Sequence, residues 1–549
     1  MSMTVRRSKE DLFLLSFLIM LCIYHIVARF GLAVDLQWHT DVGRDKLLTP
    51  PHLMIFAGIV PTAVFLFGYL IWNSFYKPHK VGSDLKLGPF YAPASIWMLC
   101  TGMFTLTIGG LFDDYWHASY GVDTTIITPP HVWTFAGGML VEAATLVLAL
   151  ELKHKMKDQT PHWINVIVLG TLWALVYHFH LAFANFLDPR VSTLDIFSFQ
   201  LILHFVFAGA VLMTFLPLGE RWLGRHGVLR LSGVMLGSQV LFLVLVPFLV
   251  TSFMTEEHVL RPGAPHTTYA ANCLPWLLFP AVFIVSKFTS ITDKKILIPL
   301  VLTVDVAWLP TFIEHTPVEV GILNSVLSVF LSAAILWLIW PITQGLGPAI
   351  ERLALRTSSQ GIKPVRKKKS VALVVLMLVF LSMSAPLASA HAIHFSEEGD
   401  GFDAPMRYLI DVNDTYVWVE FMMWPPKAKT VVEVSILPAE NESAMIDDVW
   451  VTLVYPDERG EVKMKTLFEN PGGYGLWESQ VNFPYAGDQT IEIWLEVDGD
   501  AGFTEIPVDV AGPPSLPVWL AWFIALAWPA ASVLMWRRIS FLPVQGVIA

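Results

Sequence analysis

The chain is poor in charged residues. Only 15% of its 549 residues are Asp, Glu, Lys or Arg, whereas 54% are hydrophobic. A soluble globular protein would carry about 25% charged residues, so this composition excludes that class and indicates an integral membrane protein. The formal net charge of −11 is uneven, because acidic residues concentrate in residues 395–510. The sequence has no basic stripe, so nothing in it suggests a nucleic-acid partner.

Cysteine is scarce as well. Cys22, Cys100 and Cys273 all lie in or beside apolar stretches and show no pairing pattern. The polar region that follows residue 391 has no cysteine. We therefore expect that region to be stabilised by its hydrophobic core and not by disulfides.

Long hydrophobic stretches, in contrast, are abundant. Twelve of them approach the 20 or so residues with which a helix crosses a bilayer. They fall near residues 11–33, 51–75, 92–112, 130–151, 162–187, 196–216, 227–253, 272–289, 295–313, 319–342, 369–390 and 515–536. We predict a polytopic α-helical membrane protein with about 12 spans, in contact with lipid.

The Lys and Arg residues predict how these spans are oriented. They cluster before the first span, at Arg6 and Arg7, and then in alternate loops up to Arg537 and Arg538 after the last span. Cytoplasmic loops carry an excess of Lys and Arg. We therefore expect a multi-pass protein of the cell membrane with both termini in the cytoplasm and residues 391–512 outside it.

Residues 391–512 differ in pattern from the rest of the chain. Polar and apolar residues alternate in six short segments, separated by turn sequences such as Trp-Pro-Pro and Asn-Pro-Gly-Gly. The segments are residues 416–423, 431–437, 449–455, 463–468, 477–483 and 490–497. Six or seven strands over about 110 residues predict an extracytoplasmic antiparallel β-sandwich of the immunoglobulin-like kind.

Residues 370–390 allow two interpretations. They follow Arg-Lys-Lys-Lys and end in Ala-Ser-Ala, so they match a membrane span or a signal sequence with its cleavage site. A signal in mid-chain suggests a fusion protein, with a second polypeptide starting at His391.

The whole chain is expected to have five parts. They are a duplicated four-helix unit (1–160), a six-helix membrane region (161–345), a basic linker with the segment before His391 (346–390), the sandwich (391–512) and a last span with its tail (513–549).

One motif occurs twice, at residues 35–52 and 113–131. Each copy has an Asp, a Trp-His pair whose His lies four residues after the Asp, and Thr-Pro-Pro-His at the start of the next apolar stretch. If the preceding helix extends through the motif, the Asp and the first His share one face. The double Pro favours a helix start just before the second His. The members are Asp35, His39 and His52 in the first copy and Asp113, His117 and His131 in the second.

Two imidazoles and a carboxylate form a ligand set for a first-row transition metal such as copper, zinc or non-haem iron. The alternative is structural: Trp would mark the membrane interface, Pro would start a helix, and His would bond a loop carbonyl. Ionisable residues that face a bundle at span ends are functional by default. Their recurrence at matched offsets favours metal binding, with no catalytic residue identified beyond the ligands.

The first copy resembles a known family. Residues 38–52, Trp-His-x4-Arg-Asp-x4-Pro-x-His, look like a loop in the C subunit of the copper-dependent membrane monooxygenases, the particulate methane and ammonia monooxygenases. The resemblance covers roughly residues 10–150. It implies that Asp35, His39 and His52 bind copper, and we expect Arg44 and Asp45 to fix the orientation of these ligands.

The second copy resembles the other proposed copper site of that subunit, an Asn-x3-His-x13-His set. It maps onto Asp113, His117 and His131, with Asp113 where the family has Asn. The added negative charge favours a harder or divalent ion, so zinc is an alternative to copper here. Asp123, six residues after His117, is the counterpart of the first copy's Asp45.

The C-terminal part resembles the B subunit of the same complex, which begins with a His and carries a cupredoxin-like domain before a membrane helix. Here His391 and His394 remain as imidazole ligands. The strand that holds a His-x-His pair in the family corresponds to residues 488–492, which contain no His.

Weaker candidates lie within the spans. His178 and His180 diverge on a helix, so one of them is expected to pair with His204 or to make a polar packing contact. Glu142 and Asp305 are costly in a span and would bond a neighbouring helix or line a proton path.

Three hypotheses follow. The first is a copper-dependent monooxygenase that oxidises a small, apolar molecule with dioxygen, alone, as an oligomer or with additional subunits. The second is a copper transport or copper-handling protein without oxygenase activity, and the third is a non-catalytic scaffold.

Overall fold

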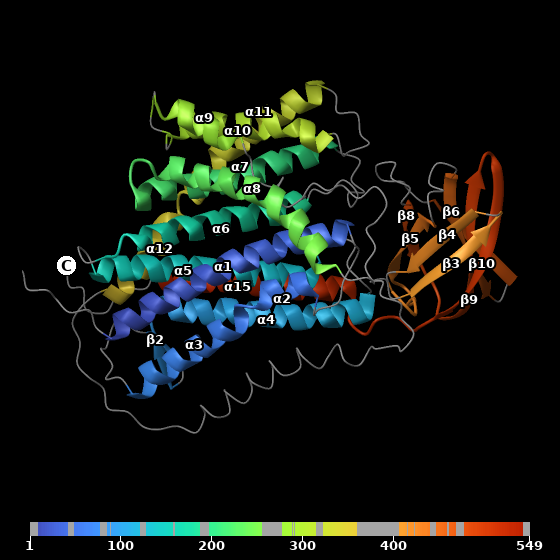
Figure 1. Cartoon of the computed structure of the whole chain (residues 1–549), viewed down its shortest axis with the longest axis horizontal. Helices are drawn as coiled ribbons and strands as arrows, with labels where there is room; N and C mark the ends of the chain where they lie inside the picture. Colours follow the sequence, from blue (N-terminus) through green and yellow to red (C-terminus); the bar gives the residue numbers. More distant parts are fainter. Residues whose placement is uncertain are drawn as a thin grey trace, which may run out of the picture.

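The computed structural model describes residues 9–41, 49–76, 85–87, 89–120, 128–156, 160–186, 197–254, 277–287, 289, 291, 293–313, 322–358, 406–413, 415–421, 423–439, 446–457, 460–467 and 477–541. Within these residues, nine helices are long and apolar enough to cross a membrane. The helices run side by side along the long axis of the molecule, and the strands of residues 406–510 lie beyond one end of them (Figure 1).

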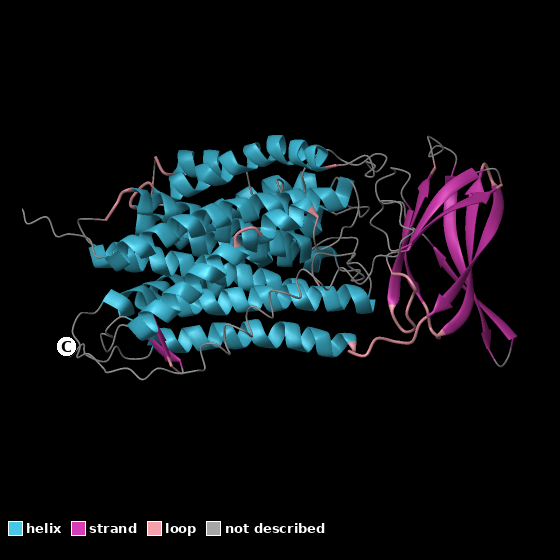
Figure 2. Ribbon diagram, turned by 60° about the horizontal axis from the view of Figure 1, so that its bottom comes forward, coloured by secondary structure: helices cyan, strands magenta, loops and turns pink. Residues whose placement is uncertain are grey.

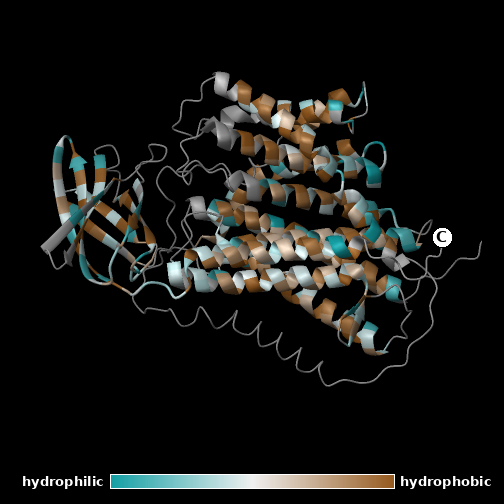
Figure 3. Cartoon of the chain, turned by 180° about the vertical axis from the view of Figure 1, so that it is seen from behind, coloured by the Kyte–Doolittle hydropathy of each residue, from teal (hydrophilic) through white to brown (hydrophobic). Residues whose placement is uncertain are grey.

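The helical bundle is built from apolar segments whose ends are marked by Pro, Gly and charged residues. Its larger helices are α1 (Lys9–Asp41), α3 (Ile59–Ile71), α4 (Ala94–Tyr120), α5 (Pro129–Met156), α6 (Trp163–Phe186), α7 (Phe197–Leu223), α8 (Gly227–Phe253), α10 (Lys294–Ile313), α11 (Ile322–Thr343) and α15 (Val518–Phe541). Shorter helices are α2 (Pro50–Phe56), η1 (Trp72–Tyr76), α9 (Leu278–Val285) and α12 (Leu346–Ser358), and a small hairpin comprises β1 (Leu85–Leu87) and β2 (Phe90–Ala92). Figure 3 shows the hydrophobic colouring that dominates the bundle.

Nine of the twelve expected spans coincide with helices that could cross a membrane. For the other three expected spans, the described residues form no helix that is long and apolar enough to cross a membrane. In residues 272–289 the described helix is α9, whose eight residues extend only about 12 Å. Residues 295–313 form α10, whose described apolar part is Lys295–Val304. Residues 369–390 lie outside the described part of the chain.

The C-terminal domain is an antiparallel β-sandwich (Figure 2). One sheet has the order β10-β9-β6-β7 and the other has the order β3-β4-β5-β8. Their bounds are β3 (Met406–Val412), β4 (Thr415–Phe421), β5 (Val431–Pro438), β6 (Ile446–Asp457), β7 (Gly460–Leu467), β8 (Trp477–Asn482), β9 (Gly487–Val497) and β10 (Asp500–Val510). Alternate residues of both sheets form one apolar core that includes Val419, Val434, Val451 and Ile493.

All six predicted strands are present, and the structure adds β3 and β10. The signal for β10 is the dipeptide Asp498-Gly499, which joins β9 to β10 with both residues at positive φ. Asp-Gly is a favoured two-residue hairpin turn because its backbone twist matches that of the flanking strands.

The sandwich contacts the bundle at the end where α4 finishes. The Tyr115 hydroxyl lies 3.0 Å from Ser515 Oγ, and the Tyr120 hydroxyl donates to the carbonyl oxygen of Leu516. Tyr120 also packs against the core of the sandwich. The segment before α15 is thereby held against α4, close to the second copy of the repeated motif.

Candidate functional site

The first copy of the motif brings a carboxylate and an imidazole together. Helix α1 continues through Asp41, so Asp35 and His39 lie four positions apart on one helix. Helix α2 then returns with His52 in its first turn. Asp35 Oδ1 lies 3.2 Å from His52 Nε2, and the two side chains are only 11% and 19% exposed. The predicted pairing of Asp35 with His52 is therefore present.

The second copy repeats this arrangement between α4 and α5. Asp113 Oδ1 lies 3.6 Å from His131 Nε2, with the side chains 14% and 27% exposed. His117 lies on α4, four positions after Asp113. The Asp–His distance is thus slightly longer in the second pair than in the first, and its side chains are more exposed to solvent.

Both returning helices begin in the same way. The Thr49 carbonyl accepts the Leu53 N–H at 2.9 Å, and the Thr128 carbonyl accepts the Val132 N–H at 3.0 Å. Two prolines follow each Thr, where the missing N–H groups would have had no helical partner. This start places the second His of each copy in the first turn, facing the preceding helix.

Glycine sets the helix spacing at both sites. Gly31 and Gly109 each lie four residues before the Asp of their copy. A Cβ atom on Gly31 would lie 2.8 Å from the backbone nitrogen of Ile55, and one on Gly109 would lie 2.8 Å from that of Thr134. Because each helix pair is in backbone contact at the same offset, its Asp and His can meet. These glycines were the signal that the motif analysis missed.

Aromatic side chains flank both pairs in the same positions. Phe56 lies 6.1 Å from the His52 ring, and Phe135 lies 6.4 Å from the His131 ring, each one turn after its His. Trp38 is fully buried and Trp116 is 8% exposed. These apolar groups limit the access of water and make each pair a partly desolvated site.

The observed separations fit metal ligands. Tetrahedral donors at roughly 2.0–2.1 Å from an ion lie about 3.3 Å from one another. The Asp–His separations of 3.2 and 3.6 Å are on either side of that value. Among the side chains that the structure describes, no group of three or more His, Cys, Asp and Glu could hold an ion. The third predicted ligands, His39 and His117, have side chains outside that described set.

The two pairs lie near each other. The Asp35 carboxyl group interacts electrostatically with His131 and Asp113 as well as with His52. An ion bound at one pair would therefore alter the charge felt at the other.

Several other predicted residues lie outside the described part of the chain: Arg44, Asp45, Asp123, His391 and His394 have no described position, and His204 and Asp305 no described side chain. In the sandwich, Glu492 occupies the strand that was compared with the His-x-His pair. It accepts from Lys463 Nζ at 2.7 Å and from Trp494 Nε1 at 3.1 Å. That carboxylate is therefore already engaged by protein groups.

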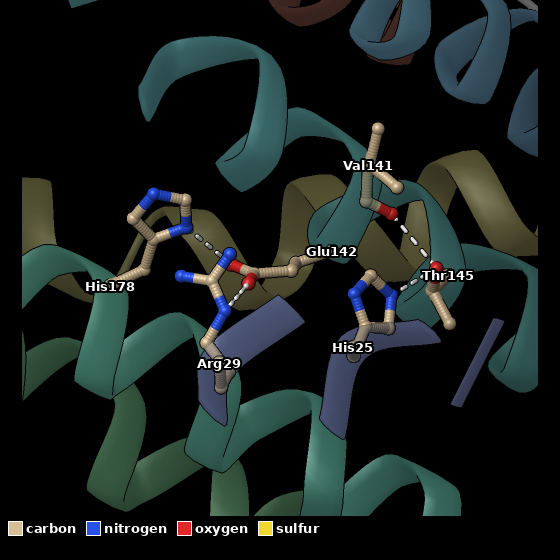
Figure 4. A network of polar contacts seen from close by, with 6 residues as sticks. All are labelled: His25, Arg29, Val141, Glu142, Thr145 and His178. Atoms are coloured by element: carbon tan, nitrogen blue, oxygen red, sulfur yellow. Dashed lines mark hydrogen bonds and ion pairs between the residues drawn. The ribbon is translucent and has the colours of Figure 1, made fainter. Parts of the chain in front are cut away.

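A buried charged network lies deeper in the bundle (Figure 4). Arg29 Nε on α1 is 3.5 Å from Glu142 Oε1 on α5, and His178 Nδ1 on α6 is 3.2 Å from Glu142 Oε2. The side chains of Arg29, Glu142 and His178 are 8%, 1% and 3% exposed. The described partner of His178 is thus Glu142, which the sequence had only suggested as a residue bonding some neighbouring helix.

His25 extends this network along α1. Its Nε2 lies 2.9 Å from Thr145 Oγ1, and Thr145 donates to the Val141 carbonyl at 2.8 Å. Sequence reasoning missed His25 as a functional candidate. The available signal was the spacing of His25 and Arg29, four residues apart within one apolar stretch.

Fold and site together define a protein with many apolar, membrane-length helices, an antiparallel sandwich and two matched carboxylate–imidazole pairs. No protein-family model matches the chain, and no curated protein matches it. Its function has to be inferred from its own residues.

Proposed function

We propose that this chain is a copper-dependent monooxygenase-like membrane protein that oxidises a small, apolar molecule with dioxygen. The observation that carries the proposal is the matched pairing of Asp35 with His52 and of Asp113 with His131. Both hairpins retain the close-contact glycine and the first His at equal offsets from the Asp, and both carry the second His in the first turn of the next helix. This repetition favours binding over packing. The resemblance to the C subunit of the copper membrane monooxygenases supports copper as the metal.

Each residue has a separate role in the proposed sites. Asp35 and Asp113 supply negative charge, and His52 and His131 supply neutral nitrogen ligands. His39 and His117 are the third ligands, because each lies one helical turn after its Asp. Bound copper would supply the activation of dioxygen, while the flanking aromatic residues exclude water from the site.

The second pair is proposed to prefer zinc or Cu(II). Asp113 stands where the resembling family has a neutral Asn, and its carboxylate is only partly exposed. A full negative charge at short range stabilises a divalent ion more than a monovalent one, particularly where solvent screening is weak.

We place the sandwich and both pairs on the extracytoplasmic side, with both termini in the cytoplasm. Arg221 at the end of α7, Arg225 before α8, and Arg537 and Arg538 near the end of α15 all lie toward the opposite end of the bundle. An excess of Lys and Arg marks cytoplasmic ends. A total of about 12 spans, which includes residues 272–289, 295–313 and 369–390, fits this alternation.

Copper transport without oxygenase activity is the second candidate. The buried polar network below the pairs favours it, because a transport site requires polar groups that continue through the membrane. Arg29 argues against it, since its guanidinium already balances the charge of Glu142, so this carboxylate is not available as a ligand for a copper ion in transit. The oxygenase proposal is therefore preferred.

Oxygen consumption distinguishes these functions. Copper-loaded protein in nanodiscs would be supplied with a reductant and short-chain alkanes, and dioxygen uptake and product would be measured. We expect activity in wild type and in His162→Ala, whose exposed side chain lies away from the pairs, and loss in His52→Ala. Equal turnover in wild type and His52→Ala, or copper movement across vesicles without turnover, would reject the oxygenase.

A further inference from the structure

The Arg29–Glu142–His178 cluster has a defined charge state. Glu142 is fully buried at the middle of α5 and lies beside the permanently charged Arg29. The guanidinium stabilises Glu142 as a carboxylate, which can only accept hydrogen bonds. His178 must then donate its Nδ1–H to Glu142 Oε2, across the 3.2 Å contact. In the neutral ring this leaves Nε2 as the basic nitrogen.

His25, one helix away, has the opposite arrangement. Thr145 has a single hydroxyl proton, which it donates to the Val141 carbonyl. The Thr145 oxygen can therefore only accept from His25, so His25 carries its proton on Nε2. The two buried histidines are thus expected to be different tautomers, and His25 is held as a hydrogen-bond donor.

The packing around His178 fixes its ring in the orientation that brings Nδ1 to Glu142. A Cβ atom on Gly138 would lie 2.5 Å from His178 Cε1, so only glycine leaves room for the ring. Phe135 packs edge-on against it with centroids 5.4 Å apart. The ring is thereby fixed against Glu142 from both sides, as in the carboxylate–imidazole pairs that act as general bases.

Arg29 Nη1 is buried and forms no hydrogen bond with any described residue. Two further titratable groups on α1 border this cluster: His25 interacts electrostatically with His178 and Glu142, and Tyr24 interacts with Arg29 and Glu142.

We propose that His178 is the proton-transfer residue of the bundle, oriented by the carboxylate of Glu142, whose charge is balanced by Arg29. In the step, the Nε2 lone pair of His178 takes a proton from a hydronium ion or hydrated acid, leaving water or the conjugate base. The resulting imidazolium then releases the same proton, with no change of oxidation state. Reduction of dioxygen at the outer pairs would consume such protons, and that part of the inference rests on the proposed function.

Deuterium exchange at histidine C2 tests the transfer step directly, because it requires imidazolium formation and access of solvent ions. The full chain in nanodiscs, treated with a chelator so that no metal is bound, would be incubated in D2O across a pH series and analysed by mass spectrometry. We expect His178 to exchange at least about tenfold faster than His25, although both are buried. Equal, slow exchange of the two rings would show that His178 is a structural residue and overturn the proposal.

Nitrogen-15 NMR of labelled histidine gives the second readout on unmutated protein, with His178→Gln and His25→Gln used only to assign signals. We expect the Nδ1–H tautomer at His178 and the Nε2–H tautomer at His25. The reverse tautomer at His178 would also overturn the proposal. Because neither measurement needs bound metal or turnover, failure here is distinguishable from failure of the oxygenase proposal.

Discussion

At the scale of the residue, three carboxylates determine how the charged and imidazole side chains of the bundle are paired. Asp35, Asp113 and Glu142 each contact an imidazole, and Glu142 also compensates a buried guanidinium. The first two contacts were predictable because helical periodicity and Pro-Pro helix starts place the groups. The pairing of Glu142 with Arg29 and His178 was not, because it depends on how three helices pack.

Replacement of Glu142 by Gln is expected to destabilise the protein by about 3–5 kcal/mol, because it leaves Arg29 buried without a counter-charge. The double variant Glu142→Gln, Arg29→Met should recover much of that loss. Unfolding in mild detergent with increasing denaturant measures both. If the single and double variants are equally unstable, the ion pair is not the source of the effect.

Replacement of Asp113 by Asn is expected to weaken divalent-ion binding at the second pair by roughly tenfold or more, because a carboxylate charge is lost from a partly desolvated site. The first pair should keep its ion. Site-resolved X-ray absorption with zinc and Cu(II) would measure this. Unaltered binding would mean that Asp113 is not a ligand.

At the scale of the element, two helical hairpins repeat one geometry. In each, a glycine lets the helices touch, and the Asp and His then meet one turn further on. The sequence repeat revealed the Asp and His residues, whereas the role of the glycines became visible only through the backbone contacts.

Gly31→Ala and Gly109→Ala should each weaken metal binding at their own pair, since the new Cβ lies 2.8 Å from a backbone nitrogen of the facing helix. The matched control is Gly68→Ala in α3, where nothing lies within 4 Å. That substitution is expected to be neutral or to stabilise its helix by about 0.5–1 kcal/mol. Isothermal titration with Cu(II) and Zn(II) would compare the three variants, and an equal effect of all three would contradict a spacing role.

The contact between α4 and the segment before α15 should weaken at alkaline pH. Burial raises the pKa of Tyr120 above its usual value of 10.0, so the folded state favours the neutral phenol that donates to Leu516. The stabilisation is complete below pH 10 and is lost as the pH rises through the raised pKa.

Backbone amide exchange near residue 516, measured from pH 8 to 11 and corrected for intrinsic rates, should therefore show increased opening. The variant Tyr120→Phe should show that opening at all pH values. An identical pH dependence in both proteins would exclude Tyr120 as its cause.

At the scale of the whole molecule, composition and alternation predicted the two parts of the fold. Apolar length identified nine helices that could cross a membrane, and alternation identified six of the eight sandwich strands. Apolar length left the expected span at residues 272–289 unconfirmed, because the described helix there, α9, has only eight residues. Alternation also missed β10, because Pro507 within it argues against a strand. The proline is accommodated because β10 is an edge strand, fixed by its hairpin with β9.

The proposed orientation can be tested by labelling from outside intact cells with a membrane-impermeant thiol reagent, after Cys22, Cys100 and Cys273 are changed to Ser. Tyr485→Cys, at a 57% exposed position in the sandwich, should react. Arg225→Cys, exposed before α8, should react only after permeabilisation. Labelling of both or neither in intact cells would refute the orientation.

The measurement that most directly tests the central claim is the metal content of the purified protein, because the proposed chemistry requires ions bound at the Asp–His pairs. Wild type, His52→Ala, His131→Ala, their double variant and the exposed control His162→Ala would be loaded with copper, desalted and analysed by mass spectrometry. We predict that the control matches wild type, that each single substitution at a pair removes one bound ion, and that the double variant retains none. Undiminished copper in the double variant would contradict the assignment of these Asp–His pairs as metal sites.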